Sequence, residues 1–163
     1  MEIRRVGVVG LGTMGAGIAQ VALQAGNEVV GREVTAELGD HARSKIDHFL
    51  ARAVEKGRME QADKDAAMDR LTTTTEVGDL AEADLVIEAI VEELPPKREL
   101  FAELERITRP EAILATNTSA LSVSQIAEAT ERPDRVIGMH FFNPAPLLPL
   151  VEVVRAERSS EEA

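Results

Sequence analysis

The sequence of 163 residues contains no cysteine, no tryptophan and no tyrosine. The absence of cysteine excludes disulfides, thiolate nucleophiles, iron–sulfur clusters and cysteine-based zinc sites. Phenylalanine occurs four times, so the core has to be built mainly from aliphatic side chains, and no aromatic platform is available for stacking nucleic-acid bases. The three histidines show no metal-ligand spacing, and no metal site is expected.

Basic residues are also scarce, because 18 lysines and arginines stand against 29 acidic residues and the formal net charge is −11. This balance disfavours nucleic acid and anionic membrane as partners. The hydrophobic content of 44% excludes wholesale disorder, and the length suits one domain with its own core. The uncharged stretch 6–27 imitates a signal peptide or a membrane span, but its six glycines disfavour a continuous helix. We therefore expect a cytoplasmic protein.

Apolar runs alternate with segments of helical period along most of the chain. The patterns predict strands at 3–9, 28–33, 72–75, 84–91, 112–115, 136–142 and 150–154, and helices at 14–25, 35–56, 61–71, 95–108 and 123–130. This alternation predicts an α/β fold, a doubly wound and mostly parallel sheet in one domain over residues 1–163. The Ser-x-x-Glu pattern at 159–162 is typical of a capping box at the start of a helix. Two interpretations remain: the chain is cut at the start of an element, or it ends in a frayed polar tail.

Residues 10–15 form the pattern Gly-x-Gly-x-x-Gly, directly after an apolar strand and at the start of a helix. In this context the pattern predicts a Rossmann dinucleotide site. The first glycine permits a tight turn, the second lets the backbone approach a pyrophosphate, and the third lets helix and strand pack closely. The helix N-terminus offers free N–H donors to that anion. The residues expected to line the cofactor here are Gly10, Gly12, Thr13, Met14 and Gly15.

An acid should follow at the end of the second strand, and Glu33 stands 21 residues after Gly12. Such an acid accepts hydrogen bonds from the adenosine ribose hydroxyls. Arg32 leaves NADP open, since an arginine can receive a 2′-phosphate, but strand alternation sends its side chain to the other side. NAD is therefore the predicted cofactor. Gly31 lies inside the predicted strand, where glycine is unfavourable, and the sequence does not explain why it is there.

Three later segments sharpen the prediction. They are LVIEAIVE at 85–92, ATNTS at 115–119, and GMHFFNP at 138–144 running on to LVEVV at 150–154. With the glycine motif they make the chain resemble the NAD-binding domain of the L-3-hydroxyacyl-CoA dehydrogenases, and most closely the 3-hydroxybutyryl-CoA branch. The resemblance covers essentially the whole chain. It implies the reversible, NAD-linked oxidation of a short-chain L-3-hydroxyacyl-CoA to the 3-oxoacyl-CoA.

The same resemblance assigns roles to individual residues. It places the catalytic pair on His140 and Glu152, with Ser119 contacting the substrate. The cofactor contacts that it adds are Glu92, Lys97, Asn117 and Asn143. The family often has Asp where Glu33 stands. It also has a second, all-helical domain that completes the acyl-CoA site and forms a homodimer, and that domain is missing here, so the resemblance favours truncation over a frayed tail.

On their own chemistry these residues leave alternatives open. A lone histidine near a strand end is more often structural than catalytic, and Glu152 either pairs with His140 on a neighbouring strand or is a solvated edge residue. Ser119 either caps the next helix or polarises the substrate oxygen. Charge alone predicts that Glu92 and Lys97 are solvent-exposed side chains at the start of a helix. Glu88, inside an apolar strand, is expected to be a buried and hydrogen-bonded acid.

Other functions fit the same fold. One is a dehydrogenase that acts on a 3-hydroxyacyl group on another carrier, or on a sugar acid. Another is a module that binds a dinucleotide and turns over almost nothing. The run APLLPL at 145–150 is unusually apolar for a loop and predicts an exposed docking surface.

Overall fold

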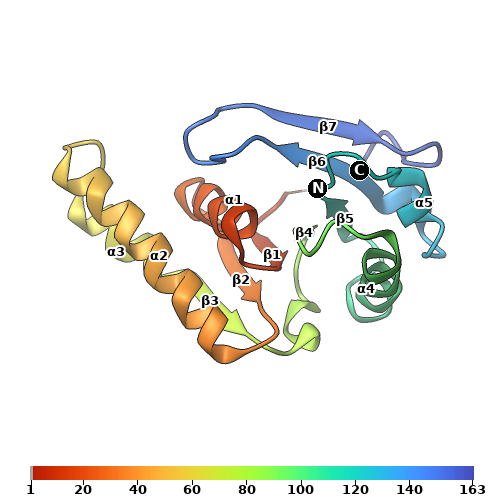
Figure 1. The fold of residues 1–163 in the computed structure, drawn as a ribbon, viewed down its shortest axis with the longest axis horizontal. Helices are drawn as coiled ribbons and strands as arrows, with labels where there is room; N and C mark the ends of the chain where they lie inside the picture. Colours follow the sequence, from red (N-terminus) through yellow and green to blue (C-terminus); the bar gives the residue numbers. More distant parts are fainter. Residues whose placement is uncertain (1) are drawn as a thin grey trace.

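A computed structural model describes residues 2–163 as one seven-stranded sheet with helices packed on both of its faces (Figure 1). The strands are β1 (Arg5–Val9), β2 (Glu28–Arg32), β3 (Leu71–Thr74), β4 (Leu85–Glu88), β5 (Ile113–Thr116), β6 (Val136–Phe141) and β7 (Val151–Arg155). The helices are α1 (Thr13–Gln24), α2 (Ala36–Glu55), α3 (Gln61–Asp69), α4 (Leu94–Ile107) and α5 (Val123–Ala127), with two short 3-10 turns, η1 (Val77–Leu80) and η2 (Pro133–Arg135).

The strand order β3-β2-β1-β4-β5-β6-β7 confirms the doubly wound prediction. All neighbours are parallel except β6 and β7, which pair antiparallel. The chain leaves β1 toward β2 on one side and returns to β4 on the other. In open α/β sheets ligands bind at the carboxyl ends of the strands beside such a reversal.

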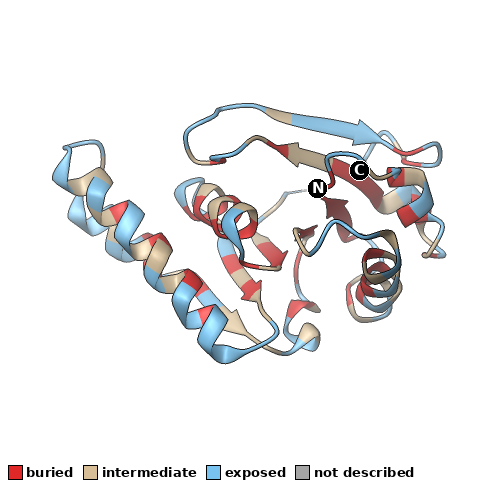
Figure 2. Cartoon of the chain, viewed as in Figure 1, coloured by how far each residue is buried: buried red, intermediate tan, exposed pale blue. Residues whose placement is uncertain are grey.

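Two apolar clusters cover the two faces of the sheet. One joins β1 to α1, α2 and α3 through side chains such as Ile18 and Ile46, and the other joins β1 and β4 to α4 and α5 through Phe101 and Ile126. Successive strand residues alternate between them, so that Val8 belongs to the first cluster and its neighbour Val9 to the second. Both faces are therefore buried, as the near-continuous apolar strands predict. Figure 2 shows the buried positions concentrated on the central strands.

Two of the helices, α2 and α5, begin at a capping side chain. The Thr35 side chain accepts a hydrogen bond from Leu38 N and begins α2, and the Ser122 side chain accepts one from Gln125 N and begins α5. The largest error in the expected bounds is at β4, which ends at Glu88 rather than at residue 91. There the Glu88 carboxylate accepts a hydrogen bond from Ile90 N at 2.7 Å, so the chain turns at once.

Gly31 has a packing reason that the sequence did not reveal. A Cβ added to Gly31 would lie 2.7 Å from Cδ1 of Leu11, whose side chain is buried against β2. The missing side chain therefore makes room for the glycine turn that follows β1.

The capping box at 159–162 does not begin a helix at Ser159. The buried Ser159 hydroxyl instead donates to Val136 O at 2.5 Å and accepts from Ala156 N at 2.8 Å, which ties the end of β7 to the start of β6. Ser160 Oγ accepts a hydrogen bond from Ala163 N at 3.2 Å. This is the bond that an N-cap makes to the third residue of a helix, one position later than the sequence pattern predicted.

β7 lies at one edge of the sheet and is largely exposed. Leu150 and Val154 share a face with Glu152 and have large exposed fractions, so this face is apolar in composition but not buried. Within residues 2–163 no helix is long and apolar enough to cross a membrane.

Candidate active site

The glycine turn closes between β1 and α1 as the motif predicts. Gly10 has φ of +84°, which disfavours residues with a side chain, and a Cβ there would lie 2.7 Å from Ala89 O. A Cβ on Gly15 would lie 1.7 Å from Gly10 O, so the third glycine is required for contact between the turn and the helix. A Cβ on Gly12 would meet nothing within 4 Å. The open space above the N-terminus of α1 therefore begins at Gly12.

Glu33 lies where β2 ends and reaches back to this turn. Its Oε1 accepts a hydrogen bond from Leu11 N at 2.6 Å, and its Oε2 accepts one from Val34 N at 3.0 Å. Arg32 points elsewhere, because its Nε donates to Thr75 O at 3.2 Å beyond β3. The carboxylate thus lies beside the glycine turn and the guanidinium is engaged on the next strand.

These residues fit a dinucleotide. The space at Gly12 admits a pyrophosphate against the first amides of α1, where the helix dipole favours an anion. The Glu33 carboxylate has acceptor capacity left for ribose hydroxyls, since each of its oxygens accepts one hydrogen bond from a backbone N–H and has a second lone pair. The individual cofactor contacts of Thr13 and Met14 stay predictions.

The predicted His140–Glu152 pair is present. The two residues are directly opposite in the antiparallel register of β6 and β7, and His140 Nδ1 lies 2.9 Å from Glu152 Oε2. The side chain of Glu152 is 56% exposed and that of His140 is 23% exposed. The Phe142 ring packs against the imidazole at a centroid distance of 4.7 Å. An ionised carboxylate only accepts hydrogen bonds, so the His140 proton lies on Nδ1, toward Glu152. Nε2 of the neutral imidazole is then free to accept a proton or a hydrogen bond.

Ser119 lies in a turn after β5 that is organised by Glu92. Glu92 Oε1 accepts hydrogen bonds from the Thr118 hydroxyl, from Ser119 N at 3.0 Å and from Ala120 N at 3.4 Å. Burial raises the pKa of Glu92, but these bonds and the Lys97 ammonium outweigh burial and hold the pKa below its ordinary value. The Ser119 residue itself is exposed.

Lys97 differs most from the prediction made by charge alone. Its side chain is 1% exposed, so a solvated helix start is wrong for this residue. Its Nζ binds Glu88 Oε1 and lies 3.3 Å from Glu92 Oε2. Glu88 is fully buried and also accepts from the Thr116 hydroxyl at 2.7 Å, which confirms the expected buried acid. Position along the sequence did not predict this pair, because it depends on how α4 packs over β4.

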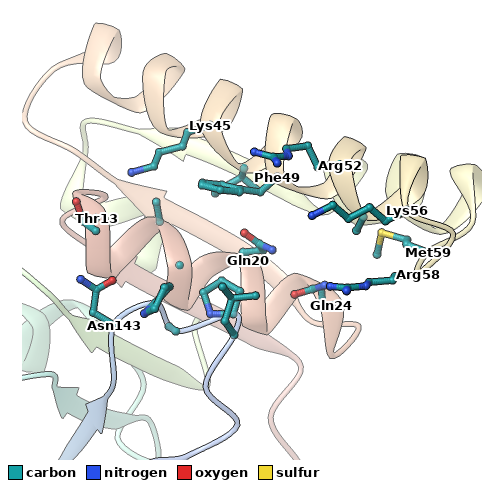
Figure 3. Close-up of a pocket in the computed structure, with 18 of the residues that line it drawn as sticks. Thr13, Gln20, Gln24, Lys45, Phe49, Arg52, Lys56, Arg58, Met59 and Asn143 are labelled. Atoms are coloured by element: carbon teal, nitrogen blue, oxygen red, sulfur yellow. The ribbon is translucent and has the colours of Figure 1, made fainter.

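The two asparagines occupy different places. Asn117 Oδ1 accepts a hydrogen bond from Phe141 N at 2.9 Å and so joins the end of β5 to β6 beside His140. Asn143 is exposed and lines a cavity that also contains Thr13 (Figure 3). The contacts that the resemblance assigned to these residues stay predictions.

That cavity lies between α1 and α2 and has a volume of about 600 Å³. Figure 3 shows it running from Thr13 and Asn143 to Lys56 and Arg58 at the far end of α2. The charged residues that line it are Lys45, Arg52, Lys56, Arg58 and Asp63. Four cations and one acid gather here in a chain with a net charge of −11, so the cavity favours an anionic ligand.

The family model described as 3-hydroxyacyl-CoA dehydrogenase, NAD binding domain, matches residues 5–163. The chain belongs to this family. The family resemblance expected from the sequence is therefore confirmed, and NAD is the cofactor of this domain.

Curated relatives and solved structures agree with this assignment. The chain is 49% identical over 162 residues to a 3-hydroxybutyryl-CoA dehydrogenase of Mycobacterium tuberculosis, covering 99% of this chain and 57% of the relative. It is 43% identical to a probable 3-hydroxybutyryl-CoA dehydrogenase of Bacillus subtilis, covering 99% of this chain and 56% of the relative. The structure of 3-hydroxybutyryl-CoA dehydrogenase from Escherichia coli K12 matches with a TM-score of 0.97 and 41% identity, over 99% of this chain and 34% of that one. The chain thus spans little more than half the length of the curated relatives that it matches.

Proposed function

We propose that this chain is the NAD-binding and proton-transferring part of an enzyme that oxidises a short-chain L-3-hydroxyacyl-CoA to the 3-oxoacyl-CoA. The observation that carries the proposal is the His140–Glu152 pair, which lies in register on the antiparallel strands β6 and β7. The names of its relatives support the same reaction.

The chemistry divides between cofactor and protein. NAD, when bound, supplies the acceptor for the hydride that leaves C3 of the substrate. His140 Nε2 removes the proton of the 3-hydroxyl as the C3–O bond becomes a carbonyl, and returns it in the reverse reaction. Glu152 holds the Nδ1 proton and stabilises the imidazolium that forms. Ser119, presented by the turn that Glu92 organises, is proposed to hydrogen-bond the substrate oxygen.

The basic cavity between α1 and α2 supports CoA as the carrier. CoA carries an adenosine 3′-phosphate and a pyrophosphate, and the cavity offers Lys45, Arg52, Lys56 and Arg58 within one volume. Its opposite end reaches Asn143, three residues after His140 in the sequence. We propose that the nucleotide of CoA binds at the basic end and that the acyl group extends toward His140.

A turnover assay tests the function. The protein to be assayed is a chimera in which the part of the M. tuberculosis relative beyond the matched region follows this chain, and the reaction is the reduction of acetoacetyl-CoA by NADH. Acetoacetyl-pantetheine, an acetoacetyl carrier-protein thioester and a 3-keto sugar acid serve as alternative substrates. We expect turnover with the CoA thioester and a higher KM for the pantetheine ester, which lacks the phosphates. Turnover only with another carrier would overturn the assignment of CoA, and NADH binding without any turnover would leave a dinucleotide-binding module.

Cofactor choice follows from Glu33. We expect the chain to bind NADH more tightly than NADPH, because the carboxylate repels a 2′-phosphate. Glu33→Gln keeps an acceptor for Leu11 N but removes the negative charge, so it should reduce the preference for NADH over NADPH while leaving the fold intact. Glu33→Ala should also weaken NADH binding. Fluorescence titrations with both cofactors provide the measurement, and tighter NADPH binding by the unchanged chain would contradict the prediction.

The surface predicted at 145–150 is exposed only from Leu147 onward, because Ala145 is buried and Pro146 is half-buried. We propose that this exposed run, 147–150, docks against the remainder of a longer protein. Leu147 is 70% exposed and Leu150 57% exposed, and β7 beside them has a free edge. By the family resemblance that remainder would be a helical domain that also forms a homodimer. We propose the cytoplasm as the location, since the apolar stretch 6–27 that imitates a signal peptide folds into β1, the turn and α1.

This surface has a measurable consequence. The isolated chain should bind a hydrophobic dye or self-associate at high concentration, because exposed apolar patches favour contact with other apolar surfaces. Leu147→Ser with Leu150→Ser should reduce both effects, whereas Leu38→Ser at an exposed site on α2 should not. A strictly monomeric chain without dye binding would argue against the docking surface.

A further inference from the structure

The most unusual feature outside the proton-transfer pair is a chain of charges under the carboxyl ends of β4 and β5, which is buried at Glu88 and Lys97 and exposed at Glu92. Glu88 and Lys97 are 0% and 1% exposed and bind each other. Lys97 also lies 3.3 Å from Glu92, and Glu92 receives the Thr118 hydroxyl and the Ser119 and Ala120 amides. We call these residues, Glu88, Lys97 and Glu92 with the turn 118–120, the Glu88–Lys97–Glu92 network.

Stability alone does not account for Glu88 and Lys97. Removing a carboxylate and an ammonium from water is so unfavourable that well-packed apolar side chains often serve folding equally well at such positions. The Glu88 carboxylate nevertheless accepts three hydrogen bonds within the protein, from Lys97 Nζ, Ile90 N and the Thr116 hydroxyl. The arrangement is specific and costly, so a role other than stability has to be sought.

The network lies next to the cofactor turn. Ala89 N donates to Val9 O at 2.8 Å, and a Cβ on Gly10 would lie 2.7 Å from Ala89 O. Glu88 is therefore one residue before the backbone that packs against the glycine turn. At its other end the network fixes the backbone of Ser119, the proposed substrate contact.

We propose that Glu88 is a positioning residue that acts through Lys97. By holding the Lys97 ammonium beneath Glu92, it keeps Glu92 and the turn 118–120 in the geometry that receives cofactor and substrate. The inference rests on the proposed function, but its first measurement does not require turnover or cofactor. Within residues 2–163 the Lys97 ammonium binds only these two carboxylates, so loss of Glu88 removes one of its two anchors.

The decisive experiment replaces both buried charges by apolar residues of similar size, in the double variant Glu88→Leu/Lys97→Met of this chain. Melting temperature, amide hydrogen exchange at Ser119 and Ala120, and the NADH dissociation constant are measured. We expect the variant to fold, because no unpaired buried charge remains, but with a lower melting temperature, because Ile90 N and the Thr116 hydroxyl lose their acceptor. Exchange at the two amides should accelerate about tenfold or more, and NADH should bind about tenfold more weakly, since one charge-assisted contact to Glu92 is gone.

Two further variants keep the inference falsifiable. Lys64→Met removes a lysine that pairs with Asp47 on the far helices α2 and α3, and should leave amide exchange at Ser119 and NADH binding unchanged. If the double variant does not fold, Glu88→Gln, which retains an acceptor for Ile90 N, should still accelerate exchange at both amides. Normal exchange and normal NADH affinity in a folded charge-free variant would overturn the inference. Failure of the unchanged chain to bind NADH would instead count against the proposed function, and the exchange data would still decide the role of Glu88.

Discussion

His140→Gln, introduced into the chimera described above, is expected to lower turnover of acetoacetyl-CoA by about 10²–10⁴-fold, the usual worth of a positioned acid–base group. Glutamine has nearly the shape of the imidazole edge but cannot take up a proton from the 3-hydroxyl at neutral pH. The chain contains no cysteine or tyrosine that could replace it. The measurement is kcat and kcat/KM by following NADH absorbance, with NADH affinity determined in parallel.

NADH affinity is the control for this variant, because His140 lies on β6 and the cofactor turn follows β1. It should remain close to that of the unchanged protein. Glu152→Gln should also lower kcat, since it removes the charge that stabilises the imidazolium but nearly keeps the shape of the Glu152 side chain. If His140→Gln retained most of its turnover, the base would have to be sought at Ser119 or in a bound water.

A second large effect is expected from the glycine turn, where two similar substitutions should fail in different ways. In Gly15→Ala the new Cβ would lie 1.7 Å from Gly10 O, a backbone atom that cannot move aside alone. We expect the free energy of unfolding to fall by more than the roughly 1–3 kcal/mol typical of an overpacked site. Denaturant unfolding followed by circular dichroism measures this change.

Gly12→Ala is the matched comparison. Its Cβ would have no protein atom within 4 Å, so the stability should be nearly unchanged. The methyl group would instead occupy the space assigned to the pyrophosphate, and NADH should bind at least about tenfold more weakly, which corresponds to roughly 1.4 kcal/mol. Normal NADH affinity in Gly12→Ala would show that the pyrophosphate does not lie above this residue.

Local patterns predicted the positions of all seven strands and five helices, because period, glycine and proline act over a few residues. The His140–Glu152 pair was predicted from the family resemblance, whereas strand alternation alone left Glu152 open between pairing with His140 and a solvated edge position. Burial of Lys97 was not predicted, because its charge is satisfied only when α4 packs over the end of β4.

Two further features depended on contacts between distant segments. The reason for Gly31 is the Leu11 side chain from a different element, and Ser159 is used by β6 instead of by a helix. In both cases the residue type suggested one local role, and packing against another element assigned a different one. Local sequence patterns therefore predicted strands and turns better than the packing contacts between distant elements.

The edge position of β7 has a consequence for how the protein loses activity. The hairpin of β6 and β7 carries the proposed acid–base pair, and its outer strand has one neighbour and no buried residue. The glycine turn instead follows β1, a central strand in which four of five residues are buried. Segments of low burial open at lower free energy than the core. The imidazole and its carboxylate can therefore separate by local fraying of one strand while the dinucleotide fold persists, so that heat or mild denaturant would first produce a protein able to hold its cofactor but unable to move a proton.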